Sequence, residues 1–177
     1  ELYLQTTARM RGTTPHFVDK LPVNYLHLPL ILAALPNAKI VHLVRGAMDA
    51  CFSSFKQLFA DAYLHSYEQR EMARHHIRYR RLMAHFREAF PGRFIEIHYE
   101  DAARDLEPHA RSLISQLGLA WEDRCLNFHE SDSGVATASA VQVRQPAHTR
   151  SIGRWRRYAE QLAPMHETLT SAGILAE

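Results

Sequence analysis

Arg45 and Ser53 are spaced so that together they could bind a phosphate group. Arg45 ends a run of apolar and β-branched residues, and Ser53 follows eight positions later in a segment with helical periodicity. A guanidinium at a strand tip, a helix N-terminus and a hydroxyl that faces back can jointly hold phosphate. The structural alternative is that Arg45 pairs with Asp49 and that Ser53 hydrogen-bonds a carbonyl of its own helix.

Lys20 and a group of arginines could also act on an anion. Lys20 ends a short strand-like run and could donate to a transferring group as a point charge, or it could be a solvated lysine paired with Asp19. No acidic residue occurs between Ser133 and Ala159, a stretch that contains Arg144, Arg150, Arg154, Arg156 and Arg157. This stretch could fold over a polyanionic ligand, or it could be a solvated basic surface.

Hydrophobic periodicity predicts the elements that would position these side chains. Strands are predicted over residues 16–20, 38–45 and 93–100, the second of them buried on both faces. Helices are predicted over residues 1–11, 24–35 (with a kink or a late start at Pro29), 48–60, 66–90, 101–118 and from 151 onward. This alternation predicts an α/β fold, in which a parallel β-sheet is flanked by helices.

The ends of the predicted strands indicate where a ligand would bind. In open parallel sheets, ligands bind beyond the carboxyl ends of the strands. Lys20, Arg45 and Tyr99 stand at or just after these ends. We therefore expect the binding site to be built around these positions.

The composition is that of a globular protein with an apolar core. The chain has 177 residues, of which 46% are hydrophobic and 23% are charged, and this length predicts a single domain over residues 1–177. No apolar run reaches the roughly 20 residues that a membrane span needs, and the first residues lack the features of a secretion signal. Cys51 and Cys125 lie far apart, as expected for reduced thiols, so we expect a cytoplasmic protein.

Several other functions are disfavoured by the sequence. The net charge is only +2. The arginines at 70, 74, 78 and 81 have helical spacing, with Glu68 and Glu71 interleaved at the N-terminal end, and they have no aromatic platform, so nucleic-acid binding is not expected. The twelve histidines are scattered or adjacent, and no metal site is expected. Neither a GxSxG nucleophile elbow nor a Walker phosphate loop occurs.

Three segments in the same order resemble the sulfotransferase family. They are FVDKLPVNYLHLPLILAALPNAKIVHLVRGAMDACFSSFKQLF (17–59), RFIEIHYEDAARD (93–105) and TASAVQVRQPAHTRSIGRWRRY (137–158). The resemblance covers nearly the whole chain. It is to the bacterial sulfotransferases that carry tetratricopeptide repeats and are similar to tyrosylprotein sulfotransferases.

The resemblance implies a donor and the residues that bind it. The donor of this family is 3′-phosphoadenylyl sulfate (PAPS), which leaves as adenosine 3′,5′-bisphosphate (PAP). Arg45 and Ser53 match the motif that holds the 3′-phosphate, and Tyr99 matches a tyrosine near the adenine. Arg154 takes the place of a basic residue that binds donor phosphate.

The resemblance also implies the catalytic residues and the reaction. Lys20 matches the lysine that contacts the leaving oxygen and the sulfuryl group, and Ser139 matches a serine beside the sulfate. The implied reaction is in-line transfer of a sulfuryl group to an acceptor hydroxyl of a protein tyrosine, a sugar or a small molecule. The implied parent chain has tetratricopeptide repeats upstream.

The sequence also departs from the family pattern. The PxSGTT-like loop that wraps the 5′-phosphosulfate, and the helix that supplies the general base, should precede this chain. We therefore expect an N-terminally truncated and inactive sulfotransferase domain. Gly46-Ala47 replaces the usual Asp-Pro pair, and Gln57 stands where the tyrosylprotein enzymes have a further arginine. The alternatives are a non-catalytic nucleotide-binding or protein-interaction module on the same fold, and a nucleic-acid-binding domain.

Overall fold

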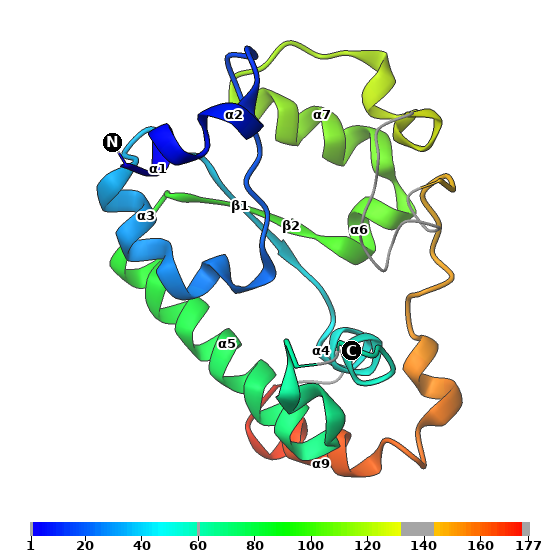
Figure 1. Ribbon diagram of the computed structural model, residues 1–177. Helices are drawn as coiled ribbons and strands as arrows, with labels where there is room; N and C mark the ends of the chain where they lie inside the picture. The colour runs from blue at the N-terminus through cyan, green and yellow to red at the C-terminus, as the bar shows by residue number, and fades with distance from the viewer. Residues whose placement is uncertain (1, 60, 132–143, 175–177) are drawn as a thin grey trace. The chain divides into compact units, whose positions relative to one another are not determined.

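The computed structural model describes residues 2–59, 61–131 and 144–174 of the chain (Figure 1). It divides into two compact units, Glu1–Ala38 and Lys39–Glu177. The single domain expected from the sequence stays a prediction.

The first unit is helical. It contains α1 (Leu2–Thr6), α2 (Ala8–Arg11), the 3-10 helix η1 (Pro22–His27) and α3 (Leu28–Ala34). Gly12 follows α2 with a φ of 65°, a conformation that favours glycine and ends the helix. The late helix start predicted at Pro29 is confirmed, because α3 begins at Leu28 and has proline in its first turn, where the missing N–H costs no hydrogen bond.

The strand predicted over residues 16–20 is wrong. In the first unit this segment has no strand partner, and the side chain of Val18 is 91% exposed. Side chains hold the segment instead: Tyr3 Oη donates to Asp19 Oδ2 at 2.6 Å, and Asn24 Nδ2 donates to Asp19 Oδ1 at 3.2 Å. The local β pattern was present, but a strand also needs a neighbouring strand to receive its backbone hydrogen bonds.

The second unit contains the predicted α/β arrangement. Strands β1 (Ile40–Val44) and β2 (Phe94–His98) pair in parallel, with Val41 opposite Ile95 and Leu43 opposite Ile97. The elements that accompany them are α4 (Ala47–Phe55), η2 (Leu64–Tyr67), α5 (Gln69–Ala89), α6 (Tyr99–Arg104), α7 (Leu106–Leu117), η3 (Asp123–Cys125), η4 (Phe128–Glu130), η5 (Arg154–Tyr158) and α9 (Ala163–Ser171). Figure 1 draws α5 on one side of the strands and α7 on the other, so the fold class is confirmed.

Several predicted elements differ in detail. β1 is not buried on both faces: Val41 and Leu43 point away from α5, and Leu43 is 57% exposed. The helix predicted over residues 101–118 is two helices, because Asp105 between α6 and α7 has a non-helical backbone. The helix predicted from residue 151 is divided into η5 and α9.

The core of the second unit lies between helices α4, α5 and α9 and the 3-10 helix η5. Its fully buried side chains include Met48 and Cys51 of α4, Ala73 of α5, and Met165 and Leu169 of α9. Burial raises the pKa of the Cys51 thiol to about 12, so this cysteine is a packing residue rather than a nucleophile. The core therefore fixes α4, the helix that carries Ser53.

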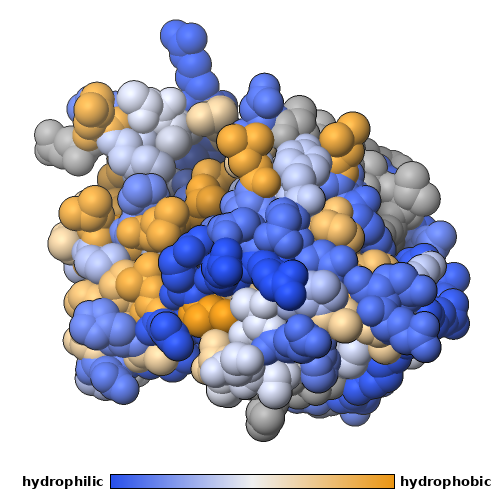
Figure 2. Space-filling view, turned by 90° about the horizontal axis from the view of Figure 1, so that it is seen from below, coloured by the Kyte–Doolittle hydropathy of each residue, from blue (hydrophilic) through white to orange (hydrophobic). Residues whose placement is uncertain are grey.

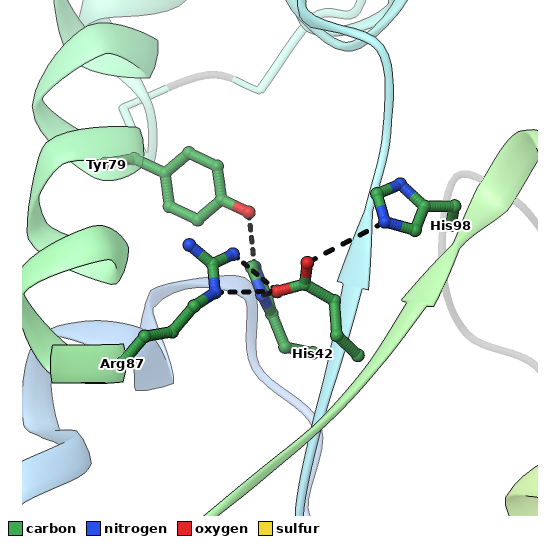
Figure 3. Close-up of polar contacts among 5 residues, drawn as sticks. His42, Tyr79, Arg87 and His98 are labelled. Carbon is green, nitrogen blue, oxygen red and sulfur yellow. Dashed lines mark hydrogen bonds and ion pairs between the residues drawn. The ribbon is translucent and has the colours of Figure 1, made fainter. Parts of the chain in front are cut away.

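A polar network ties α5 to both strands (Figure 3). His42 of β1 contacts Glu96 Oε2 of β2 through Nδ1 at 3.1 Å and the hydroxyl of Tyr79 through Nε2. Arg87 of α5 donates from Nε to the same Glu96 oxygen at 2.9 Å, and His98 lies 3.7 Å from the other oxygen. Burial lowers the pKa of His42, although Glu96 opposes this effect. The network sets the position of α5 on this face of the sheet.

The surface carries both apolar and charged side chains. Figure 2 shows hydrophobic residues beside strongly hydrophilic ones on one face of the molecule. In the second unit the exposed large hydrophobic side chains include Leu58, Leu64 and Tyr67. No helix in the described part of the chain has both the length and the apolar character needed to cross a membrane.

His76 on α5 should make the stability of the fold depend on pH. Burial first, and then the charges of Arg80 and His75, lower the pKa of His76 to about 4, and its Nε2 is buried with no hydrogen-bond partner among the described residues. The unfolded chain then binds more protons between about pH 4 and 6.5, so the fold loses stability as the pH falls through this window. From pH 7 to 5 we expect this histidine to reduce the free energy of unfolding by about 2 kcal/mol.

Denaturant unfolding at a series of pH values measures this effect, with His76→Leu as the test variant. Leucine fills a similar volume but does not titrate, so the variant should show a shallower loss of stability between pH 7 and 5. An identical pH dependence in the two proteins would contradict the assignment to His76.

Candidate functional site

A polar pocket of about 130 Å³ lies at the carboxyl ends of β1 and β2. Three segments that are distant in the sequence build it: the turn after β1 together with helix α4, the start of α6 directly after β2, and the segment that leads into and begins η5. Its lining residues are Arg45, Asp49, Phe52, Ser53, Lys56, Tyr99, Ser151 and Arg154. All of them belong to the second unit.

Four of the six predicted site residues line this one pocket: Arg45, Ser53, Tyr99 and Arg154. Arg45 follows the last residue of β1 and Tyr99 follows the last residue of β2, so the parallel pairing brings the two together. Lys20 lies in the first unit, in the segment without secondary structure before η1. Ser139 lies outside the residues that the structure describes.

The Arg45 guanidinium is held by two contacts. Its carbon lies 4.7 Å from the centre of the Tyr99 ring, and Nη2 donates to the backbone oxygen of Ser151 at 3.1 Å. Its Nε is buried and has no hydrogen-bond partner among the described residues. A buried N–H without a partner costs stability unless another group binds it.

The structure contradicts the alternative in which Arg45 pairs with Asp49 and Ser53 hydrogen-bonds a carbonyl of its own helix. Asp49 does not pair with Arg45; its carboxylate accepts hydrogen bonds from the backbone N–H of Gly153 and from that of Trp155, the latter at 3.3 Å. Among the described residues, the Ser53 hydroxyl makes no hydrogen bond to a carbonyl of α4. Both side chains therefore remain available to a ligand in the pocket.

Asp49 attaches the start of η5 to α4. The carboxylate is only 6% exposed, and it supplies acceptors for N–H groups at the beginning of a helix, where no partner within the helix exists. Gly153 has a φ of 67°, and a Cβ there would collide with the guanidinium of Arg156. Asp49 and Gly153 together fix the turn that carries Arg154 to the pocket.

Glu100 secures the turn between β1 and α4. Its Oε1 accepts a hydrogen bond from the backbone N–H of Gly46 at 2.9 Å. Gly46 has a φ of −50°, which any residue can adopt, and Ala47 is buried in the core. Glu100, the second residue of α6, thus holds the turn that contains Gly46 and Ala47.

Lys56 is a pocket cation that the sequence analysis missed. It caps the C-terminus of α4 with a helical backbone conformation, seven positions after Asp49 and three after Ser53, and it lines the pocket with both. That helical spacing was a signal that could have found it. Desolvation and the charges of Arg154 and Arg45 lower the pKa of Lys56, and Asp49 acts in the opposite direction.

The charges in the pocket favour an anion. Three cations line it, and the carboxylate of Asp49 is already engaged by backbone N–H groups. Residues 2–59, 61–131 and 144–174 contain no group of three or more His, Cys, Asp or Glu that could hold a metal ion. The arrangement of guanidinium, ammonium and hydroxyl groups fits a phosphate group, and the Tyr99 ring adds an aromatic surface.

Comparison with known proteins decides the family. The sequence model of the sulfotransferase family matches residues 1–123. The chain belongs to the sulfotransferase family. A protein from Aquifex aeolicus (strain VF5), described as uncharacterized, is 34% identical to it over 172 residues, which is 96% of this chain and 23% of that protein. The chain therefore spans about a quarter of the length of this relative.

The sulfotransferase match includes most of the candidate site. Arg45, Ser53 and Tyr99 of the pocket fall within residues 1–123, as does Lys20 of the first unit, and Arg154 follows outside the matched range. Since Arg154 reaches the same pocket, the site extends to a part of the chain that the family match does not cover.

Asp49→Asn should destabilise this sulfotransferase-family fold. The change removes the charge that accepts two backbone hydrogen bonds and places an amide N–H₂ beside backbone donors. We expect the free energy of unfolding to fall by about 1–3 kcal/mol, measured by denaturant titration at neutral pH. The exposed carboxylate Asp61 gives a matched control, Asp61→Asn, which should change stability little. Equal stability of the two variants would contradict the role of Asp49.

Proposed function

We propose that this chain carries the donor-phosphate site of a PAPS-dependent sulfotransferase. The observation that carries the proposal is the convergence of Arg45, Ser53, Tyr99 and Arg154 on one pocket in a chain that belongs to the sulfotransferase family. The residues present fit the donor: an unpartnered buried guanidinium nitrogen, further cations and an unengaged hydroxyl suit a phosphate.

The proposed binding roles follow from the chemistry of each side chain. Arg45 and Ser53 bind the 3′-phosphate, the first as a charged donor in a low-dielectric environment and the second as a hydroxyl donor. Tyr99 offers its ring next to the adenine, and its contact with the Arg45 guanidinium keeps that ring in place. Arg154 adds a second guanidinium for donor phosphate.

The proposed catalytic roles belong to Lys20 and Ser139. When bound, PAPS supplies a sulfuryl group for in-line transfer to a hydroxyl and leaves as PAP. Lys20 stabilises the negative charge that develops on the leaving phosphate oxygen, and Ser139 donates a hydrogen bond to the sulfuryl oxygens. Lys20 suits this role because Asp19, its neighbour, is engaged by Tyr3 and Asn24 rather than by the lysine.

The proposed acceptor is a hydroxyl group, with a protein tyrosine first and sugars and small alcohols next. Tyrosine is favoured by the resemblance to tyrosylprotein sulfotransferases. Tetratricopeptide repeats upstream in the parent chain, and a cytoplasmic location, belong to the same proposal. A general base is needed to take the acceptor proton.

Sulfuryl transfer from ³⁵S-labelled PAPS tests the proposed activity. The full-length protein is incubated with tyrosine peptides, sugars and small alcohols, and the label on each acceptor is measured. The proposal predicts label on at least one hydroxyl class, and loss of that label when PAP is added as a competitor. PAPS binding with no transfer to any class would favour a non-catalytic nucleotide-binding module instead.

A further inference from the structure

Lys56 is a cation of the pocket to which the roles above assign nothing. It makes no hydrogen bond or ion pair with any other described residue. We propose that Lys56 is a further ligand of the donor's 3′-phosphate, and that it makes the pocket selective for nucleotides that carry this group. The inference rests on the proposed function and deepens it, because it names the residue that would set donor specificity.

The geometry places Lys56 in the phosphate-binding group. Asp49 and Ser53 of α4 are followed at helical spacing by Lys56, the residue that caps the C-terminus of this helix, and all three line the pocket with Arg45. The Lys56 Nζ lies 5.5 Å from the centre of the Phe52 ring, another lining side chain. This contact with the ring face leaves the three N–H donors of the ammonium group unused.

The positive charges around Lys56 favour the binding of a doubly charged anion. Arg45, Lys56 and Arg154 are close enough that the two guanidinium groups disfavour the protonated form of the lysine. Asp49 acts in the opposite direction, but its effect is smaller than that of either guanidinium group. A phosphomonoester carries up to two negative charges at neutral pH, so it relieves this repulsion better than a singly charged phosphodiester or a neutral ribose hydroxyl.

Lys56 and Arg45 can contribute differently to recognition. The Arg45 guanidinium is fixed by Tyr99 and Ser151, so it defines one orientation of the phosphate. Lys56 is a compact charge on a flexible stem and can follow the phosphate oxygens that remain. The neighbouring Gln57 does not line the pocket, so Lys56 is the residue at this end of α4 that brings a positive charge to it.

Calorimetric titration of the intact protein with two nucleotides tests the inference. PAP carries the 3′-phosphate and adenosine 5′-phosphate lacks it, so the ratio of their dissociation constants isolates this group. Lys56→Met should weaken PAP binding about 10- to 100-fold and leave adenosine 5′-phosphate binding within about twofold. Lys56→Arg, which keeps the charge, should restore most of the PAP affinity. Lys39→Met is the matched control, since Lys39 is an exposed lysine that does not line the pocket.

The outcomes separate this inference from the proposed function. If wild type prefers PAP and Lys56→Met keeps that preference, the role of Lys56 is overturned while the proposed function stands. The role is also overturned if the variant loses affinity for both nucleotides equally. If wild type itself shows no preference for PAP, both the proposed function and the inference fail. Selective loss of PAP affinity with rescue by arginine supports the inference.

Discussion

Arg45→Ala should abolish most of the affinity for PAP, with a dissociation constant at least about 100-fold higher than that of the wild type. The side chain follows directly after β1, is fixed by Tyr99 and Ser151, and has a buried Nε without a partner among the described residues. Alanine removes the charge and also the cation that orients the Tyr99 ring. Isothermal titration with PAP measures the effect.

Two further variants serve as controls for the Arg45→Ala measurement. Arg45→Lys keeps a positive charge but loses the planar fork, so it should recover only part of the affinity. Arg81→Ala removes an exposed arginine of α5 that does not line the pocket, and it should bind PAP like the wild type. Unchanged PAP affinity in a folded Arg45→Ala protein would remove Arg45 from the site.

Lys20→Ala should slow sulfuryl transfer by about 100- to 1,000-fold and leave PAP affinity within about threefold of the wild type. The expected loss is in the transition state, because Lys20 is proposed to stabilise charge that develops on the leaving oxygen only during transfer. Single-turnover measurement on the full-length protein with labelled PAPS gives the rate, and a PAP titration of the same protein gives the affinity.

Comparing the transfer rate with the PAP affinity of Lys20→Ala shows whether Lys20 acts in catalysis or only in binding. A parallel fall in PAP affinity would make Lys20 a binding residue, and unchanged transfer would favour a non-catalytic module on this fold. Lys39→Ala is the control, since Lys39 is likewise an exposed lysine. Lys20→Arg should recover part of the rate because it retains the charge.

The positions of Arg45 and Tyr99 could be predicted from the sequence because they depend on a simple rule. Two apolar runs predicted parallel strands, and the residues after such strands share one edge of the sheet. β1 and β2 do pair in parallel, and the two side chains are in contact. Ser53 followed from the helical spacing of α4.

The other structural features depend on contacts between residues that are distant in the sequence, which local sequence patterns do not reveal. Asp49 is separated from Gly153 by 104 positions, so its attachment to the start of η5 could not be read from its neighbours in the sequence. Residues 16–20 had β propensity, but their strand was not formed, because pairing depends on a partner elsewhere in the chain. Lys56 had the helical spacing of Ser53, but only the fold revealed that Arg45 and Arg154 surround it.

Titration of the full-length protein with PAP by calorimetry tests the central claim most directly. The pocket of Arg45, Ser53, Tyr99 and Arg154 is proposed to hold the 3′-phosphate end of the donor. The prediction is saturable 1:1 binding of PAP, clearly tighter than that of adenosine 5′-phosphate and largely lost in Arg45→Ala. Absence of PAP binding by the full-length protein, or equal binding of the two nucleotides, would contradict it.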